Sequence, residues 1–419
     1  MSSRVVILGG GTGGTLAANR LHRALGDAVE VTVVDQDDRH VYQPGLLFVP
    51  FGLADPEHIV RSRSAQLAPG IDMVLAGIER VDLERGAVSL AGGGELAYDV
   101  LIVATGARLQ PEETEGLLGP AWNESVFTFY DQAGAAALRG ALAEFDGGRL
   151  LVNVVDMPIK CPVAPLEFCF LADWFLGERG IRERTEITLA TPLDAAFTKP
   201  LAAQALGGLL AEKGIALETE FATGRVDAGE GRIVSWDERE LPFDLLVAVP
   251  AHAGAAYVER SAGLGDELGF IPCDPHTLQA RAASNVFVLG DAANIPTSKA
   301  GSVSHFEGET IVENVRRLLA GEELRESFDG HANCFIETGF GKALLIDFNY
   351  DNEPLAGRYP EPHIGPLPLL RESRMNHLAK LMFEWAYWHV LLPGRELPGI
   401  GSELHTAGRH APGDRGGRR

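Results

Sequence analysis

One short segment near the start of the chain constrains the fold more than any other feature. Residues 5–8 are apolar, residues 9–14 read Gly-Gly-Gly-Thr-Gly-Gly, and Leu16, Ala17 and Leu21 then recur at helical spacing. A buried strand, a glycine turn and a helix in this order form the phosphate-binding unit of dinucleotide-binding α/β folds. The sequence therefore predicts an α/β fold that begins with a Rossmann-like unit.

The glycines of this turn have separate tasks. Gly9 permits a tight turn, Gly11 lets the backbone approach a pyrophosphate, and Gly14 lets helix and strand pack closely. The N-terminus of the helix then faces the phosphates with its positive end. The cofactor-binding residues predicted here are Gly9, Gly11, Thr12 and Gly14.

Three strand ends further along extend this site. A second strand ends in Asp35, where an acid accepts hydrogen bonds from ribose hydroxyls and opposes a 2′-phosphate. Two later apolar strands end in Ala104-Thr105-Gly106 and in Gly290-Asp291. Together, in this order, they resemble the two-dinucleotide-domain flavoprotein superfamily, in which both segments return to the first domain. That resemblance implies FAD, rather than NAD, at the first turn.

A second nucleotide turn is missing where pyridine-nucleotide-dependent members of that superfamily carry one. The strand at 149–155 is followed by residues 156–165, which contain prolines, and no glycine lies between 148 and 177. Prolines lack the N–H groups of a phosphate cradle, so NAD(P)H is not expected here. Cys161 is a candidate redox thiol whose pKa Lys160 and a helix N-terminus would lower; a small buried core residue is the alternative.

Charge and composition exclude several classes of protein. The net charge of -22 opposes nucleic acid, and no apolar stretch is long enough to span a bilayer. No cleaved export signal is expected at the N-terminus. The four cysteines form no C-x-x-C pair, so neither a metal site nor a disulfide-dense scaffold is predicted.

Three segments resemble sulfide:quinone oxidoreductases. These are residues 160–167 (KCPVAPLE), 290–306 (GDAANIPTSKAGSVSHF) and 333–342 (NCFIETGFGK). The resemblance implies that Cys161 and Cys334 form a redox disulfide beside FAD. Sulfide would attack this disulfide, and the electrons would pass through the flavin to a quinone.

The same resemblance implies further site residues. Gly301 and Lys342 would contact the cofactor, and Phe340 and Phe383 the quinone. Glu167 is a candidate acid or base, and a surface-facing glutamate is its alternative. Ordinary core packing is the alternative for Phe340. Cys169 and Cys273 are interpreted as structural, and the third functional cysteine of some family members is absent before Lys160.

The C-terminal part contains an amphipathic pattern between Pro368 and Pro393. Leu378, Leu381, Met382, Trp385, Trp388 and Leu392 recur at helical spacing, with Lys380 and Glu384 on another face. The pattern resembles the family's monotopic anchor, so residues 371–395 are expected on a membrane surface, taken as the bacterial inner membrane. A helix docked on the core is the alternative. Whether the chain forms a homo-oligomer stays open.

The predicted architecture is α/β with two interleaved Rossmann-like domains and a C-terminal amphipathic-helix region. Residues 1–110 and 246–325 form the FAD domain, 111–245 the second domain, 326–405 the quinone and membrane region, and 406–419 a disordered tail. Three other functions fit part of the pattern: the flavin subunit of a flavocytochrome sulfide dehydrogenase, a type II NADH:quinone dehydrogenase, and a flavin-binding sensor without turnover.

Overall fold

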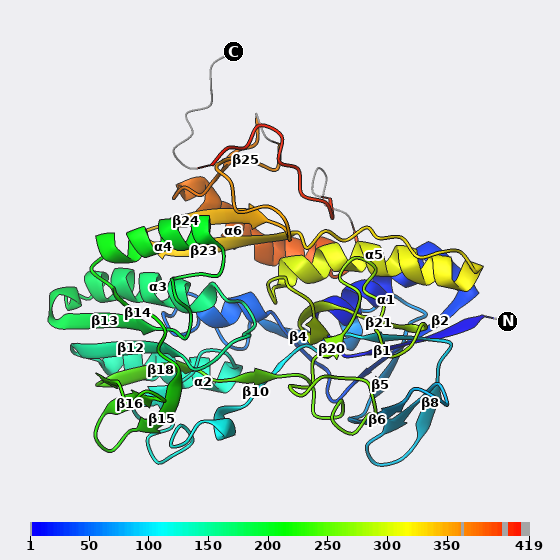
Figure 1. Ribbon diagram of the computed structural model, residues 1–419, viewed down its shortest axis with the longest axis horizontal. Helices are drawn as coiled ribbons and strands as arrows, with labels where there is room; N and C mark the ends of the chain where they lie inside the picture. The colour runs from blue at the N-terminus through cyan, green and yellow to red at the C-terminus, as the bar shows by residue number, and fades with distance from the viewer. Residues whose placement is uncertain (1, 362–363, 396–400, 412–419) are drawn as a thin grey trace.

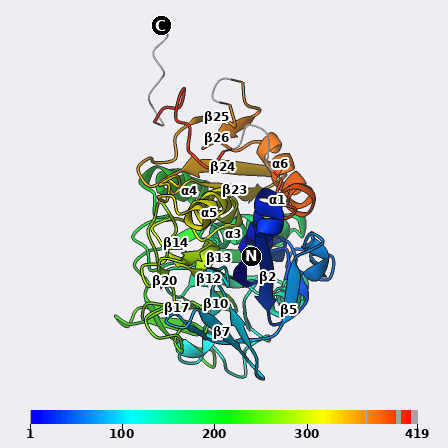
Figure 2. The same ribbon diagram turned by 90° about the vertical axis from the view of Figure 1, so that its right-hand side faces the viewer.

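The chain forms two parallel sheets that lie side by side, with a hairpin and a helix across the top of both (Figure 1). This is seen in a computed structural model, which describes residues 2–361, 364–395 and 401–411. Figure 2 shows the same arrangement from the side, with the C-terminal elements above the sheets. The α/β class and the two Rossmann-like halves were predicted correctly.

The first sheet is entirely parallel and has the order β21-β9-β1-β2-β5. Its central strands are buried on both faces because helices and loops cover them, which explains their continuous apolar runs. Helices α1 (Thr12–Leu25) and α5 (Gly301–Ala320) pack against each other. The strands are β1 (Ser3–Leu8), β2 (Val29–Asp35), β5 (Asp72–Leu75), β9 (Val100–Val103) and β21 (Val286–Val288).

The second sheet repeats this plan in the order β11-β18-β12-β13-β14, again all parallel. Helices α2 (Gln132–Glu144), α3 (Ala164–Glu178) and α4 (Pro200–Glu212) accompany it. The strands are β11 (Val126–Phe127), β12 (Gly148–Val154), β13 (Thr185–Ala190), β14 (Ala216–Glu218) and β18 (Leu245–Val249). The predicted boundary at 246 was wrong, because β18 pairs with β12 and belongs to this second sheet.

Short antiparallel strand pairs lie outside the two parallel sheets, and one of them connects the two halves. The chain crosses between them twice, and the two crossings pair with each other as β10 (Arg108–Leu109) and β19 (His252–Ala253). The other ladders are β3 (Arg39–Val41) with β4 (Val60–Ser62), β6 (Ile78–Asp82) with β7 (Ala87–Leu90) and β8 (Glu95–Ala97), and β15 (Thr223–Asp227) with β16 (Arg232–Ser235) and β17 (Glu240–Pro242). A short parallel pair joins β20 (Ile271–Pro272) to β22 (Ala293–Asn294).

The C-terminal region is built on the hairpin of β23 (Ala332–Gly339) and β24 (Lys342–Phe348). Strands β25 (Gly357–Tyr359) and β26 (Leu367–Leu369) follow, and then α6 (Arg374–Ala386), which continues as a π-helix over Tyr387–Leu391. The predicted disorder was wrong for residues 406–411. His410 pairs with Ala356, and the buried Arg409 forms an ion pair with Asp347. Residues 412–419 lie outside the described residues.

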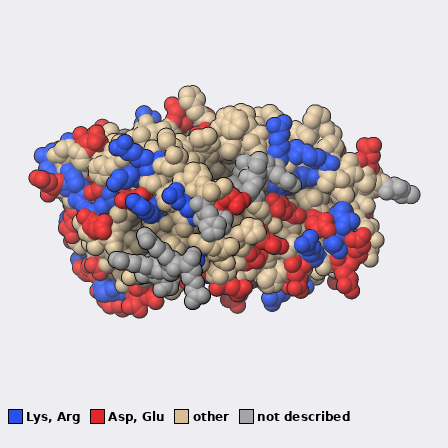
Figure 3. All heavy atoms as spheres, turned by 90° about the horizontal axis from the view of Figure 1, so that it is seen from above, with Lys and Arg blue, Asp and Glu red and all other residues tan. Residues whose placement is uncertain are grey.

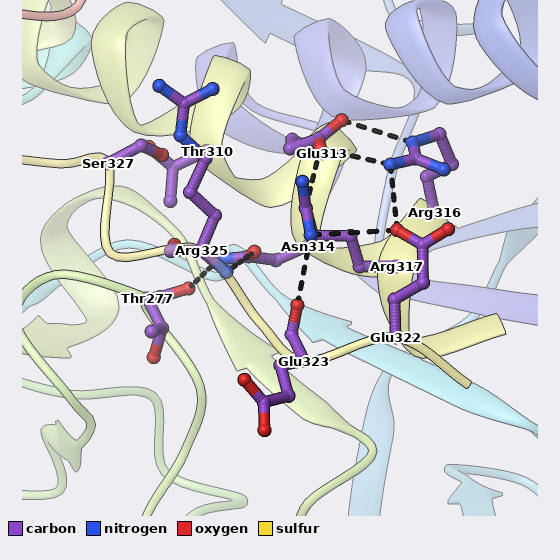
Figure 4. Close-up of polar contacts among 10 residues, drawn as sticks. All are labelled: Thr277, Thr310, Glu313, Asn314, Arg316, Arg317, Glu322, Glu323, Arg325 and Ser327. Carbon is purple, nitrogen blue, oxygen red and sulfur yellow. Dashed lines mark hydrogen bonds and ion pairs between the residues drawn. The ribbon is translucent and has the colours of Figure 1, made fainter. Parts of the chain in front are cut away.

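The end of α5 is fixed to the segment that leads into β23. Asn314 donates to the carbonyls of Thr277 and Arg325, and the Arg325 amide donates back to its side chain (Figure 4). Glu313 and Glu322 pair with the arginines of the last turn. Because the backbone that follows is anchored in this way, the strand that carries Cys334 starts from a defined position.

Candidate functional site

A cavity of about 460 Å³ lies between the glycine turn, the start of α3 and the C-terminal region. It brings together residues from nearly every predicted motif. Those that line it are Gly9, Gly11, Thr12, Asp35, Ala104, Thr105, Gly106, Cys161, Glu167, Gly290, Asp291, Gly301, Cys334 and Phe383. Segments that are far apart in the sequence therefore meet at one site.

The geometry of the glycine turn fits a dinucleotide. Gly9 has a φ of 91°, and a Cβ there would lie 2.5 Å from the Ala104 carbonyl oxygen. A Cβ at Gly14 would collide with the Gly9 carbonyl, so this glycine allows helix and strand to pack. A Cβ at Gly11 would meet nothing within 4 Å, which leaves its backbone open to the cavity. The tight turn at Gly9 and the close packing at Gly14 are those that the sequence predicted, and Gly11 leaves the space that its predicted approach to a pyrophosphate requires.

Cys161 sits in the turn between β12 and α3 in an unusual backbone conformation. Its φ of 49° is in the left-handed region, which a non-glycine residue adopts only when its surroundings impose it. Its amide donates to the Lys299 carbonyl at 2.6 Å, and its carbonyl accepts from the Tyr130 hydroxyl at 3.2 Å. These bonds hold the sulfur at the cavity wall. Tyr130 was not predicted from the sequence.

Cys334 comes to the same cavity on β23, because that strand packs against α3. The Glu337 amide donates to Glu167 Oε1 at 2.7 Å, and a Cβ at Gly339 would lie 2.8 Å from Trp174 Cβ. Both cysteines are free thiols in this structure, and the charge of Cys161 is one of the influences on the pKa of Cys334. The fold thus brings the two predicted redox cysteines into electrostatic range of each other.

The expected lowering of the Cys161 pKa was wrong. Burial raises the pKa of this thiol to about 12, and Glu167 adds to the effect. Lys160 points its ammonium at Gln43 Oε1, 3.0 Å away, and α3 begins only at Ala164. Burial also raises the pKa of Cys334. Both thiols are therefore protonated at neutral pH, although a nearby cation opposes the rise in their pKa.

That cation is Lys380 on α6, whose ammonium opposes the rise in pKa of both thiols. It forms an ion pair with Glu167 and donates to the Phe335 carbonyl at 3.0 Å. Burial lowers the pKa of Lys380, but the carboxylates of Glu167 and Glu337 outweigh burial and raise it. Lys380 therefore carries its charge at neutral pH.

Lys380 was not predicted as a site residue, whereas Glu167 was a candidate acid or base. Lys380 was assigned to a polar face of the amphipathic helix, yet its side chain is only 10% exposed. Glu167 is buried as well, so the surface-facing alternative does not hold. A second buried carboxylate, Glu337, contacts His377 Nδ1 at 2.9 Å. The pairs Lys380–Glu167 and His377–Glu337 join α6 to α3 and β23, and helical spacing alone does not reveal such contacts between distant segments.

Tyr387 links the end of α6 to the glycine turn. Its hydroxyl lies 2.8 Å from Thr12 Oγ1 and 2.6 Å from His40 Nε2, and all three residues line the cavity. Burial lowers the pKa of His40 to about 4, so this imidazole is neutral at physiological pH. Neither His40 nor Tyr387 was predicted as a site residue. The π-helix at Tyr387–Leu391 places this hydroxyl inward.

Phe340 and Lys342 do not line the cavity, contrary to the expected quinone and cofactor contacts. They lie at the turn of the β23–β24 hairpin, roughly 20 Å from Cys334 at about 3.4 Å per strand residue. Phe340 is 51% exposed, with Lys213 Nζ 4.8 Å from its ring centroid. Lys342 faces Glu372 at 3.9 Å. A motif that is continuous in sequence is therefore divided between two ends of a hairpin.

One face of α6 is apolar and exposed. Trp388 and Leu392 from the predicted pattern are buried, whereas four other members of it remain in solvent. The exposed apolar residues of α6 are Met375, Leu378, Leu381, Met382 and Trp385, which we call the α6 stripe. Figure 3 shows the molecule from above, the side on which the C-terminal elements lie, with uncharged side chains between groups of charged ones. Among the described residues no helix is long and apolar enough to cross a bilayer.

Fold and site together define a class of flavin-dependent oxidoreductase. Residues 3–144 match the family model described as pyridine nucleotide-disulphide oxidoreductase. The mitochondrial sulfide:quinone oxidoreductase of Mus musculus is 26% identical over 93% of this chain and 86% of its own length. The enzyme of the same name from Dictyostelium discoideum is 25% identical over 94% of this chain and 86% of its own length.

The solved structures agree on the fold. The sulfide:quinone oxidoreductase of Aquifex aeolicus superposes with a TM-score of 0.78 at 19% identity, covering 94% of this chain and 92% of the other. The predicted resemblance to sulfide:quinone oxidoreductases is confirmed: the chain is a homologue of these proteins over nearly its whole length.

Proposed function

We propose that the chain is an FAD-dependent enzyme that oxidises sulfide to sulfane sulfur and passes the electrons to a membrane quinone. One observation carries the proposal: Cys161 and Cys334, distant in sequence, line the same cavity as a dinucleotide-binding turn. The names of the homologous proteins support it. The proline-containing turn before α3 supports it further, since no second nucleotide cradle is available there for NAD(P)H.

The proposed reaction starts from a disulfide between the two cysteines. Hydrosulfide attacks one sulfur, the Cys161–Cys334 bond breaks, and a new sulfur–sulfur bond forms in a persulfide. The other cysteine leaves as a thiolate that keeps the electron pair. Bound FAD supplies a two-electron acceptor that quinone can reoxidise. Two cysteines suffice for this scheme, because the thiolate of one can join the persulfide of the other in a new sulfur–sulfur bond, and the two electrons released in that step are those that bound FAD would accept.

Lys380 supports the thiolate in this scheme, and Glu167 positions Lys380. A thiolate in a buried cavity is unfavourable unless a positive charge lies close to it, and Lys380 supplies that charge. Glu167 holds the ammonium in place through their ion pair, and it lines the cavity beside the sulfurs. The pair also offers a carboxylate that can take the proton of an incoming hydrosulfide. Its buried position keeps bulk water from competing for either charge.

The α6 stripe provides the route for quinone in this proposal. Phe383 and Lys380 reach the cavity from α6, while Leu378, Leu381 and Trp385 on the same helix face outward. A helix that is apolar on one exposed side binds in the interface of a membrane, where quinones are dissolved. We therefore propose peripheral membrane attachment through α6, with Phe383 bordering the quinone path.

Anaerobic flavin titration tests the proposal. Sulfide should bleach the flavin of the purified protein, NADH should not, and a short-chain ubiquinone added afterwards should restore the oxidised spectrum. Bleaching by NADH, with no response to sulfide, would contradict the proposal and favour the NADH:quinone dehydrogenase alternative. Reduction by sulfide without reoxidation by quinone would instead favour a protein acceptor, as in a flavocytochrome.

A further inference from the structure

Four ionisable side chains lead from the cavity to the surface of the molecule, next to the α6 stripe. Glu167 and Lys380 line the cavity, and their side chains are 3% and 10% exposed. Glu337 on β23 is 2% exposed and is not among the described residues that line the cavity. His377, near the start of α6, is 26% exposed. The four groups therefore begin at the cavity wall and end at a side chain that solvent reaches.

Hydrogen bonds hold these groups next to one another. His377 Nδ1 lies 2.9 Å from Glu337 Oε2 and 3.0 Å from Oε1. The Glu337 amide donates to Glu167 Oε1 at 2.7 Å, and the same oxygen forms the ion pair with Lys380. Lys380 also donates to the carbonyl of Phe335, which lies two positions before Glu337 on β23. The Lys380 ammonium is thereby held beside the strand that carries Glu337.

The charges of the buried groups act on one another. Burial raises the pKa of Glu167, Lys380 lowers it, and the charge of Glu337 raises it further. Burial lowers the pKa of Lys380, and both carboxylates raise it. Glu337 is therefore within electrostatic range of both members of the pair at the cavity wall. Two carboxylates and one ammonium leave one negative charge in excess, which favours the binding of a proton.

The other charged side chains on the strands that pack against α6 have partners of their own. Lys342 on β24 pairs with Glu372, and Asp347 on the same strand pairs with Arg409. In the sequence of β23 the only charged residue is Glu337, and the sequence of β26 contains none. The proton that balances the excess charge is therefore shared by Glu337 and the imidazole that contacts it.

The proposed reaction needs a proton from outside the cavity. Hydrosulfide releases one proton and two electrons as it becomes sulfane sulfur, and a flavin that accepts a hydride equivalent takes up the same. Reduction of a quinone to a quinol consumes two electrons and two protons. The second half of the reaction therefore needs one proton more than the first half delivers. Buried side chains form the cavity wall, so this proton requires a path through them.

We propose that His377 and Glu337 carry this proton from solvent to Lys380 and Glu167 at the cavity wall. His377 takes up a proton from water and passes it to the Glu337 carboxylate. A proton that the Lys380–Glu167 pair gives to the quinone is then replaced from Glu337, directly or through one water. Imidazole suits the first step, because it gains and loses a proton near neutral pH. The inference rests on the proposed quinone acceptor.

Rapid mixing of the flavin-loaded protein tests this inference, with each half of the reaction followed by flavin absorbance. The protein is reduced with sulfide or, separately, with dithionite, and is then mixed with a short-chain ubiquinone. In His377→Ala we expect reoxidation by quinone to slow by about 100-fold, the lower end of what a positioned proton-transfer group contributes. Reduction by sulfide should keep its normal rate, because that half of the reaction is balanced in protons. Free imidazole, which can occupy the space left by the side chain, should restore much of the reoxidation rate.

Glu337→Gln is the second variant, and it decides the question if His377→Ala does not fold. Glutamine keeps the size of the side chain but cannot pass on a proton, so reoxidation should slow to a similar extent and free imidazole should not restore it. His389→Gln is the matched control. It changes an exposed histidine in the π-helix that continues α6, whose ring centroid lies 5.1 Å from that of Trp385. This variant should be reduced and reoxidised at the wild-type rates.

Two results would overturn the proposal: equal slowing of both halves of the reaction, or normal reoxidation in His377→Ala and Glu337→Gln. Slow reoxidation of His377→Ala that imidazole does not restore would also overturn it, because that is what a purely structural role predicts. Failure of the proposed sulfide chemistry would show in the wild-type protein, which sulfide would not reduce. Reoxidation of the dithionite-reduced variants would then still decide the role of His377. A wild-type protein that quinone does not reoxidise would overturn both proposals.

Discussion

The two parallel sheets share one topology but differ in the turn that follows the central strand of each. In each, a central strand runs into a turn and then a helix: β1 into α1, and β12 into α3. The first turn is short, residues 9–11, and glycines open its backbone to the cavity. The second is longer, residues 155–163, and ends in prolines around Cys161.

The comparison shows how one topology supplies two kinds of chemistry. Glycine at the first turn exposes backbone amides, which suit a diphosphate. At the second turn the backbone carries a side chain instead, and the left-handed φ of Cys161 aims a sulfur at the same cavity. The second domain thus presents a thiol to the cavity where a nucleotide cradle would otherwise lie.

Removing the sulfur from the second turn should have the largest effect. In Cys161→Ala and Cys334→Ala we expect reduction of the flavin by sulfide to fall by about a thousandfold or more, because the covalent relay is lost. Stopped-flow absorbance of the FAD band measures it. Cys169→Ala, on the same α3 helix but in the core, is the matched control and should reduce at the normal rate. Normal rates in both active-site variants would remove the cysteines from the mechanism.

Disturbing the first turn should come next. A Cβ at Gly14 would collide with the Gly9 carbonyl, so Gly14→Ala should force the turn open. We expect the FAD content of the purified protein to fall by roughly tenfold or more, since a small misplacement of the turn misaligns its amides. Gly140→Ala on α2, where a Cβ would meet nothing within 4 Å, serves as control. Full FAD occupancy in Gly14→Ala would contradict the assigned role.

The cation that serves the second turn gives an intermediate effect. In Lys380→Met, Glu167 loses its partner and the pKa of both thiols should rise, because Lys380 lowers them. We expect flavin reduction at pH 7 to slow by about 10- to 100-fold, and raising the pH should restore part of the rate. A pH–rate profile checks both points. A slower rate with the same pH dependence as wild type would indicate a structural role only.

The Cys161 thiol in the second turn should ionise only at high pH. With the pKa of Cys161 raised to about 12, its thiolate fraction should grow with pH up to that value. Alkylation of the reduced enzyme by iodoacetamide should therefore accelerate about tenfold per pH unit between pH 8 and 10. Mass spectrometry of the Cys161 peptide follows the rate. A plateau below pH 8 would show that bound cofactor lowers the pKa of this thiol after all.

The smallest effect is expected away from both turns, on the α6 stripe. Leu378→Asn together with Met382→Asn should weaken binding to lipid vesicles by about tenfold or more, while reduction by sulfide stays normal. Flotation with liposomes measures the binding. Leu53→Asn together with Leu268→Asn, at exposed sites on other segments, should bind as wild type does. Unchanged flotation of the α6 variant would move the membrane contact elsewhere.

The sequence allowed the backbone of the first site to be predicted, since Gly9 and Gly14 there answer local steric demands. Gly9 and Gly14 make the close backbone approaches that the motif implied, and Gly11 lines the cavity. The meeting of Cys161 with Cys334 could be stated only from a family resemblance, because it depends on α3 packing against β23. Periodicity identifies such elements but not their neighbours.

The errors have the same origin. Lys380 was placed on a polar face because helical spacing shows which residues share a side of the helix. It does not show that Lys380 packs against Glu167 of another helix. Phe340 and Lys342 were assigned to the site from the family resemblance, while an extended strand carries them away from Cys334. His40 escaped notice because its contact with the Tyr387 hydroxyl joins segments that are far apart in the sequence. Contacts between distant segments decide all three cases.

The ion pair between Lys380 and Glu167 has a consequence for how the molecule approaches a bilayer. Lys380 and Leu381 are neighbours in the chain, yet one points into the protein and the other into solvent. Rolling α6 about its axis would pull a buried charge away from its counterion, which is strongly unfavourable. The ion pair therefore fixes the rotation of α6 about its own axis. If α6 binds to lipid, the whole enzyme takes one orientation relative to the bilayer, and a lipid-borne acceptor always arrives at the same side of the cavity.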